Sequence, residues 1–249
     1  MNVNNFLGVK KDSGPFSPID LSPNLWLDAT DATTITEVSG DVSQWDDKSG
    51  NSNDVTEATN RPSNGGAING NNAIDWGSVA NSNQLGLVRG ANTDNWQDVY
   101  VVGRWDGNTT FNSYNGLFSS AIHTYNGLGV SGRYNSNYFL SVSSNWYDNL
   151  YVNTLTISSN QQVIGGSNSI SDDFILSFSA NTPIGVNGVR IGSDRNFSGR
   201  GWVGVIGEVV SFDNKLSTTD KEKMEGYLAH KWGLTANLPA LHTYKTVAP

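Results

Sequence analysis

The chain has 249 residues, of which 37% are hydrophobic and 15% are charged, and it contains no cysteine. This length suits one large all-β domain, and the hydrophobic share is sufficient for a sizeable core. The net charge of −8 disfavours binding to nucleic acid, because phosphate contacts need a clustered basic surface. No apolar run approaches the length needed for membrane insertion, and the absence of cysteine excludes disulfides, thiolate catalysis and zinc sites of the cysteine type.

Residues 1–22 are predicted to form an extended N-terminal arm ahead of the domain. Pro15 and Pro18 break any regular strand ladder, while Phe6 and Phe16 offer isolated apolar anchors. Two interpretations stay open: the arm lies as a strap on its own domain, or it docks on a neighbouring subunit. The first residues lack the basic and apolar segments of a secretory signal, so we expect no export by that route.

Residues 23–249 are predicted to form one domain, a β-sandwich built from short strands. Such strands, separated by Asn, Gly and Ser turns at spacings of roughly 8–15 residues, indicate a sandwich rather than βαβ units. Residues 202–212 show little polarity on either face, which predicts a central strand covered on both sides, and 51–72 is predicted to be a long polar loop. The expected strands cover residues 25–27, 42–45, 73–76, 98–105, 116–123, 127–131, 138–142, 151–157, 162–166, 174–178, 185–192 and 202–212.

The segment after the last strand carries clear helix signals. Ser217, followed three residues later by Asp220, predicts a helix N-terminus. The helix is expected over residues 218–232, and Gly233 is expected to end it. The apolar stripe of this helix consists of Met224, Leu228 and Trp232.

Eight short segments, three near the front and five at the end, carry a family signal. They are LWLDA at 25–29, WDDKSGN at 45–51, RP at 61–62, IGEVVSF at 206–212, LS at 216–217, EGYLAHKWGL at 225–234, LP at 238–239 and AP at 248–249. They resemble the concanavalin A-like, laminin-G-type domains found in bacterial and bacteriophage proteins. The resemblance implies an all-β fold, a concanavalin A-like jelly-roll β-sandwich with a short C-terminal α-helix and an extended N-terminal arm.

The carboxylates do not form the strand pattern of a glycan hydrolase. Such enzymes need an acid and a nucleophile or base about 5–10 Å apart, which one strand supplies at positions i and i+2 or i+4. Glu208 has the apolar Ile206 and Val210 as its same-face neighbours, and the E-x-D-x-E pattern of the hydrolases in this superfamily is missing. We therefore assign no catalytic residue, although a site assembled across strands stays open. The histidines, which have no acidic partner nearby in sequence, are His123, His230 and His242.

The polar loop at 46–54 is the best candidate for a metal site. Hard cations bind several oxygen ligands on a flexible loop, and Asp47, Asn51 and Asn53 supply such ligands here. In related laminin-G-like domains a similar loop binds calcium together with an acidic residue at the position of Glu208, so the resemblance implies that Glu208 completes a Ca2+ site. The alternative is an Asx-rich turn whose side chains cap their own backbone.

Sugar recognition needs an aromatic platform beside amide and carboxylate groups. Either of two groups meets this description, and either is equally explained as a strand end with a buried aromatic side chain, since tryptophan is more often core than ligand contact. The first group is Trp146, Tyr147, Asp148 and Asn149, and the second is Tyr134, Asn135, Asn137 and Tyr138.

The resemblance, the lack of a secretory signal and the arm together favour a non-enzymatic virion structural protein of a bacteriophage, as a capsid decoration or tail appendage. It would be made in the host cytoplasm, released by lysis and displayed on the virion surface. The expected partners are other virion proteins or copies of itself, together with host-surface or environmental glycans. The alternatives are an extracellular carbohydrate-binding module of a cell-surface or secreted bacterial protein, and a polysaccharide hydrolase or lyase.

Overall fold

Strands make up most of the regular structure. The computed structural model describes residues 14–77, 86–107, 114–121, 127–131, 138–141, 149–157, 170–195 and 198–249. The strands are β1 (Leu25–Asp28), β2 (Ile35–Val38), β3 (Asp41–Trp45), β4 (Val55–Thr56), β5 (Ser63–Ile68), β6 (Asn71–Asp75), β7 (Leu87–Trp105), β8 (Tyr114–Ser119), β9 (Gly127–Ser131), β10 (Tyr138–Ser141), β11 (Asn149–Val152), β12 (Leu155–Ile157), β13 (Phe174–Ile191) and β14 (Gly204–Phe212). The helices of the described residues are α1 (Thr218–Lys231) and the short 3-10 helices η1 (Pro18–Leu21), η2 (Ala32–Thr34) and η3 (Thr235–Asn237). None of these helices has the length and apolarity needed to cross a bilayer.

The described strands hydrogen-bond into one sheet that closes on itself. The main order is β1-β14-β6-β5-β3-β4-β7-β13-β8-β9-β10, and β14 also pairs with β7, so the path from β14 through β6, β5, β3 and β4 to β7 returns to its start. The prediction of an all-β fold with a helix near the C-terminus is confirmed. The jelly-roll sandwich is corrected, because the hydrogen bonding forms a closed barrel rather than two separate sheets.

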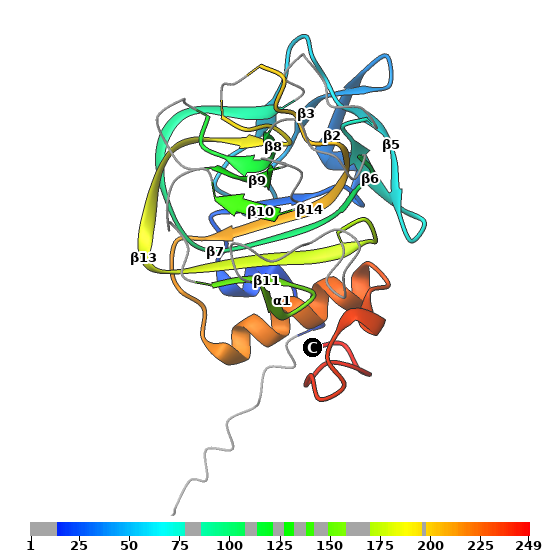
Figure 1. The fold of residues 1–249 in the computed structure, drawn as a ribbon, viewed down its shortest axis with the longest axis vertical. Helices are drawn as coiled ribbons and strands as arrows, with labels where there is room; N and C mark the ends of the chain where they lie inside the picture. The colour runs from blue at the N-terminus through cyan, green and yellow to red at the C-terminus, as the bar shows by residue number, and fades with distance from the viewer. Residues whose placement is uncertain are drawn as a thin grey trace, which may run out of the picture.

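The length of β7 explains this closure, because β7 pairs with β4 near its start and with β14 near its end, while β13 pairs along its other edge. β7 has 19 residues and β13 has 18, and they pair with each other along most of their length. The pairing shifts register between Ser179 and Ile184 and again between Asn187 and Val189, and such bulges bend a strand. Figure 1 shows both strands turning on one side of the molecule, so that each runs through the lower and the upper layer. The segments 174–178 and 185–192, which we expected as two strands, therefore belong to one continuous strand.

The stretch predicted to be a polar loop contains strands. The stretch 51–72, expected to be a loop, contains β4 and β5, which pair with β3, β6 and β7. Hydrophobic alternation did not predict these strands, because one is only two residues long and the other consists mainly of small and polar residues. The strand expected at 162–166 lies outside the described residues.

The inner face of the sheet packs around large aromatic side chains. Trp45, Trp76, Trp96 and Trp202 are fully buried and belong to one hydrophobic cluster. The rings of Trp96 and Phe118 lie 4.1 Å apart between centroids. Since one tryptophan buries about 150–250 Å² of surface, a few such residues fill a core that is poor in aliphatic side chains.

A second core lies between the outer face of the lower layer and α1. Figure 1 shows α1 beneath this layer, against β7, β13 and β14. Every residue of β14 is buried, which confirms the central strand predicted at 202–212. Gly207 allows the closest contact, because a Cβ at this position would lie 2.5 Å from the Trp232 ring. The apolar residues of this second core include Trp26, Tyr100, Ile175, Val210 and Phe212 from the strands, and Met224, Leu228 and Trp232 from the helix segment.

Both ends of α1 are capped as the sequence predicts. The Ser217 hydroxyl accepts a hydrogen bond from the Asp220 backbone amide at 3.2 Å. At the other end Gly233 has a φ of +70°, and the Leu234 amide donates to the Ala229 carbonyl at 2.7 Å. This left-handed turn with a six-residue closing bond is a Schellman motif, so the expected stop at Gly233 is confirmed.

The described part of the predicted arm packs on its own chain. The ring of Phe16 lies edge-on to that of Tyr227, with 6.0 Å between centroids, and the Phe16 amide donates to the carbonyl of Pro249 at 3.4 Å. Phe16 and Leu21 contact the second core. Residues 1–13 of the arm lie outside the described residues, so docking of the arm on a neighbouring subunit stays a prediction.

We expect Trp232→Ala to lower the free energy of unfolding by about 3–5 kcal/mol, because it leaves a cavity between α1 and β14. Urea unfolding of the purified chain measures this. Leu241→Ala is the matched control, since Leu241 is 98% exposed. Equal unfolding midpoints for the Trp232 variant and the control would mean that the helix contributes little to the stability of the sheet.

Candidate functional site

Glu208 lies at the centre of a buried polar cluster on the outer face of β14. Its carboxylate accepts hydrogen bonds from the indole nitrogens of Trp26 at 2.8 Å and Trp232 at 2.7 Å, and from the Tyr227 hydroxyl at 3.2 Å. The Lys231 ammonium lies 2.7 Å from the same carboxylate. Burial raises the pKa of Glu208, and the charge of Lys231 acts in the opposite direction. A protein ammonium therefore supplies the positive charge beside this carboxylate.

The cluster continues outward through two aspartates. Lys231 Nζ lies 2.7 Å from Asp28, and Lys48 Nζ lies 2.9 Å from both Asp28 and Asp31. Burial by itself would raise the pKa of Asp28, but the two ammonium groups outweigh it and hold this pKa below its usual value. Hydrogen bonds from Thr33 and Lys48 lower the pKa of Asp31 to about 2.

The predicted calcium loop is closed by its own side chains. The Asp47 carboxylate accepts hydrogen bonds from the backbone amides of Trp26, Ser49 and Asn53 at 2.9 to 3.0 Å. The side-chain amide of Asn53 donates to the Asn24 carbonyl at 2.7 Å. These contacts are those of an Asx-rich turn that caps backbone groups.

The structure places three of the four predicted metal ligands in one loop. Asn51 also donates to the Asn24 carbonyl, at 3.2 Å, so Asp47, Asn51 and Asn53 share one loop. Glu208 contacts the side chain of Trp26, whereas Asp47 contacts the backbone of that residue. Within the described ranges, no group of three His, Cys, Asp or Glu side chains is arranged to hold a metal ion. Calcium binding stays a prediction.

One residue of the predicted sugar platform falls within the described residues. Asn149 is the first residue of β11 and lines a pocket of about 380 Å³. The second group is represented by Tyr138, at the start of β10. The remaining members of both groups, which lie outside the described residues, are Trp146, Tyr147, Asp148, Tyr134, Asn135 and Asn137.

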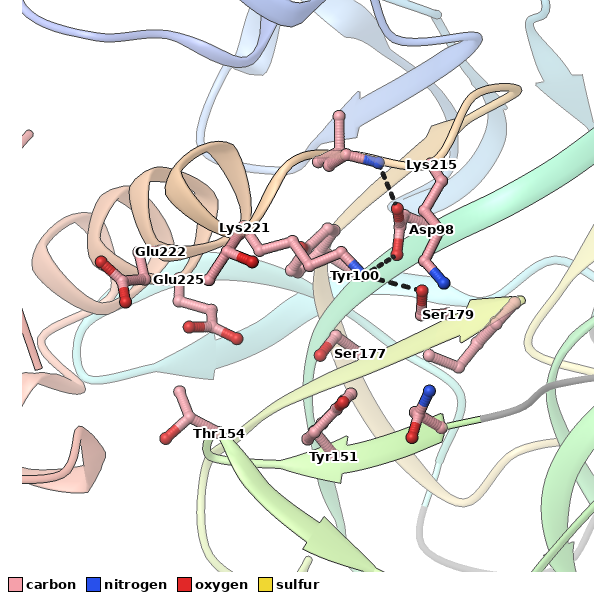
Figure 2. Close-up of a pocket in the computed structure, with 14 residues that line it drawn as sticks. Asp98, Tyr100, Tyr151, Thr154, Ser177, Ser179, Lys215, Lys221, Glu222 and Glu225 are labelled. Carbon is pink, nitrogen blue, oxygen red and sulfur yellow. Dashed lines mark hydrogen bonds and ion pairs between the residues drawn. The ribbon is translucent and has the colours of Figure 1, made fainter. Parts of the chain in front are cut away.

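The pocket lies between α1 and the outer faces of β7, β11 and β13 (Figure 2). α1 forms one wall with Glu222 and Glu225, and the hairpin of β11 and β12 forms the opposite wall with Tyr151 and Thr154. β7 and β13 form the floor between them. α1 packs on the sheet through the second core, and β11 is anchored by Leu150 and Val152 in the first cluster, so both walls are attached to the sheet.

Three hydroxyl groups in this pocket have no protein partner. Tyr100 is 2% exposed and Ser177 is 7% exposed, yet neither hydroxyl forms a hydrogen bond with another described residue. The Thr154 hydroxyl is likewise buried and unpaired within the described residues. Burial raises the pKa of Tyr100 well above its usual value, so the phenol keeps its proton and can donate it. Of these three hydroxyl oxygens only that of Thr154 is fully buried, so the hydroxyls of Tyr100 and Ser177 are the ones that a polar ligand or water in the pocket can reach.

Asp98 and Lys221 form an ion pair at one end of the pocket. Asp98 is buried, with one oxygen 2.9 Å from Lys221 Nζ and the other accepting from the Leu216 amide at 2.6 Å. Lys221 also donates to the Ser179 hydroxyl at 2.7 Å. Both oxygens of Asp98 therefore have partners, as the dashed lines in Figure 2 show.

Glu225, on the α1 wall, pairs with a histidine from the C-terminal tail. His242 Nε2 lies 3.1 Å from the Glu225 carboxylate, and His242 Nδ1 accepts from the Tyr244 amide at 3.2 Å. Burial raises the pKa of Glu225, and His242 acts in the opposite direction.

The spacing of carboxylates along a single strand does not predict this site. Asp98 comes from β7, whereas Glu222 and Glu225 come from α1, and His242 follows Glu225 by 17 positions. The available signal was the i, i+3 spacing of the two glutamates, which places both on one side of the predicted helix. It did not show what that side of the helix faces.

No protein-family model and no curated protein matches the chain. A solved structure that is similar is domain 4 of AbnA, a GH43 extracellular arabinanase from Geobacillus stearothermophilus, in complex with arabinotriose. The sequences are 14% identical and the TM-score is 0.44, with 80% of this chain and 95% of that chain covered. A likeness at this level says nothing about the ligand of this chain. The laminin-G-type and bacteriophage assignments therefore stay predictions from the sequence resemblance.

Asp47→Ala is expected to cost about 1–3 kcal/mol of stability with or without calcium, because backbone amides lose their acceptor. Asp46→Ala, in the same loop, is the control. Among the described residues, the Asp46 carboxylate accepts a hydrogen bond only from the side-chain amide of Gln44. Thermal unfolding with calcium and with chelator measures both effects. A lower melting temperature of the wild type in chelator would support the predicted Ca2+ site, and unchanged melting would contradict it.

The ion pairs of Lys48 predict a specific dependence of stability on pH. The pKa values of Asp28 and Asp31 are lower in the folded chain than in the unfolded chain, so their contribution is present above about pH 4 and is lost as the pH falls toward about 2. Lys48→Met should flatten this loss in urea unfolding between these pH values. Lys245→Met, whose ammonium contacts backbone carbonyls, should keep the wild-type slope. Equal slopes for all three proteins would contradict the assignment.

Proposed function

We propose that this chain is a non-catalytic glycan-binding protein and that the pocket under α1 takes about one or two sugar units. The observation that carries the proposal is a pair of hydroxyls, those of Tyr100 and Ser177, on the floor of a pocket of about 380 Å³, where neither has a partner among the described residues. A sugar ring presents hydroxyls that both donate and accept, so it can pair with these groups when it displaces water.

The rest of the pocket has chemistry that suits a sugar. Tyr151, which is half-buried on β11, offers an aromatic ring for the apolar face of a pyranose or furanose. Asn149, two residues earlier on the same strand, adds an amide that donates and accepts. A volume near the lower end of the usual range for ligand pockets favours a chain end or short segment over a long groove-bound polymer.

The carboxylates favour binding over hydrolysis. A glycosidase holds its two carboxyl groups on either side of the scissile bond. Glu222 and Glu225 lie on one side of α1, and the third carboxylate, Asp98, is occupied by Lys221 and the Leu216 amide. The arrangement therefore offers no free carboxylate opposite the glutamates among the described residues.

Display on a bacteriophage virion, as a capsid decoration or tail appendage, is the setting that the sequence resemblance favours for this binding. A glycan pocket would serve such a protein in attachment to a host surface or to environmental polysaccharide. It would equally serve a carbohydrate-binding module of a secreted or cell-surface bacterial protein. Mass spectrometry of purified virions against the secreted fraction of the producing cells distinguishes the two settings.

We expect saturable binding on a glycan array and no release of reducing sugar from any glycan bound. Tyr151→Ala should weaken the binding about three- to tenfold, the usual worth of one aromatic contact. Ser177→Ala should also weaken it while leaving the melting temperature unchanged or higher, since its hydroxyl has no protein partner to lose. Calorimetry with the best array ligand measures both.

Leu155→Ala is the matched control, because Leu155 is exposed on the same hairpin and does not line the pocket. Binding that neither pocket variant changes would place the glycan elsewhere on the chain. Sustained release of reducing sugar by the wild type would contradict the non-catalytic assignment.

A further inference from the structure

The charges that line the pocket are separated along its length. Figure 2 shows Lys215 and Lys221 near Asp98 at one end and Glu222 and Glu225 at the other. Lys221 is held by Asp98 and Ser179, and Lys215 donates to the Asn181 side chain. Three carboxylates against two ammonium groups leave one net negative charge among the lining residues, and it lies at the α1 end.

Among the described residues, the two glutamates at that end have no lysine or arginine within ion-pairing distance. Glu222 accepts a hydrogen bond from the Thr243 hydroxyl at 2.7 Å. Glu225, whose side chain is 15% exposed, has one carboxylate oxygen 3.1 Å from His242 Nε2. Each of these carboxylates keeps a second oxygen for a donor from a ligand.

A second observation, independent of the carboxylates, points to a ligand in the same place. Ser177 lies on β13 between Glu225 and Tyr151, and Thr154 lies opposite Glu225 (Figure 2). Ser177 is more than nine-tenths buried, lines the pocket and has no hydrogen-bond partner among the described residues. Its hydroxyl and that of Thr154 supply acceptors beside the glutamates.

We infer that the sugar taken by this pocket carries a free amino group, with its ammonium at the end formed by Glu222, Glu225 and Thr154. This inference rests on the proposed glycan-binding function. An ammonium has three donors and one positive charge, which match two carboxylates and neighbouring hydroxyl acceptors. An N-acetylated sugar lacks the charge, and a uronic acid is repelled by the same carboxylates.

The titration of Glu225 agrees with this geometry. Burial raises its pKa, and a ligand ammonium at this end would favour the ionised carboxylate. Affinity for the amino sugar should therefore fall as the pH falls through the raised pKa of Glu225, because the protonated acid no longer attracts the cation. The titratable groups that face Glu225 are His242 from the C-terminal tail, Glu222 and Lys221 on α1, Tyr100 on β7 and Tyr151 on β11.

Calorimetry with the full chain at about pH 6.5, where amino groups of this kind are largely protonated, tests the inference. The probes are a disaccharide of glucosamine with free amines, its di-N-acetyl form, a neutral glucose disaccharide and a disaccharide that contains a uronic acid. We expect the free-amine probe to bind at least about fivefold tighter than the other three, the usual worth of one partly exposed charge pair.

Glu222→Gln and the double change Glu222→Gln with Glu225→Gln should remove this preference while binding of the di-N-acetyl probe persists. Glu37→Gln, which removes the same charge from an exposed position on β2, should keep the preference. Melting temperatures of all variants confirm that they are folded.

Equal binding of amino and neutral probes, with both weakened by Tyr151→Ala, would overturn the amino-sugar inference and leave glycan binding standing. Tighter binding of the uronic probe would overturn it as well. Binding of no probe and of no glycan on the array would overturn the proposed function and this inference together.

Discussion

The position of α1 depends on the buried carboxylate of Glu208. A charge inside a protein is tolerated only when hydrogen bonds and an opposite charge replace its water. Glu208 on β14 obtains these from Trp26 on β1 and from Lys231 and Trp232 at the end of α1. One carboxylate oxygen accepts from Trp26 and Tyr227 and the other from Lys231 and Trp232, so the end of the helix is tied to the sheet through both oxygens.

The start of α1 is held by a second ion pair, between Lys221 and Asp98 on β7. Because both ends are held, the middle of the helix stays above β7 and β13 and does not fill the space beneath it. Glu222 and Glu225 project from this middle part into the pocket (Figure 2). The two ion pairs that hold the helix to the sheet thus also position one wall of the pocket, and neither of their lysines lies within ion-pairing distance of Glu222 or Glu225.

The bend of β7 and β13 makes both arrangements possible. Because each strand passes through the two layers, one half helps to enclose the tryptophan core and the other half presents Tyr100 and Ser177 on the outer face. Alternate residues of the same strand segment face opposite sides of the sheet, so Leu176 belongs to the inner core and Ser177 lines the pocket. One face of each strand segment therefore contributes to the core, and the other face contributes to the pocket.

The sequence alone was sufficient for elements whose cause is local: the helix with its caps at Ser217 and Gly233, the apolar strand β14 and the use of tryptophan as core. Capping chemistry and hydrophobic period act over a few residues, so they are visible in the chain itself. Only the tertiary structure decided that the sheet closes, because bulges within long strands have no strong sequence signal. It also decided the pocket, since the Asp98–Lys221 and Glu225–His242 pairs join different segments of the chain, and strand and helix periodicity does not encode such contacts.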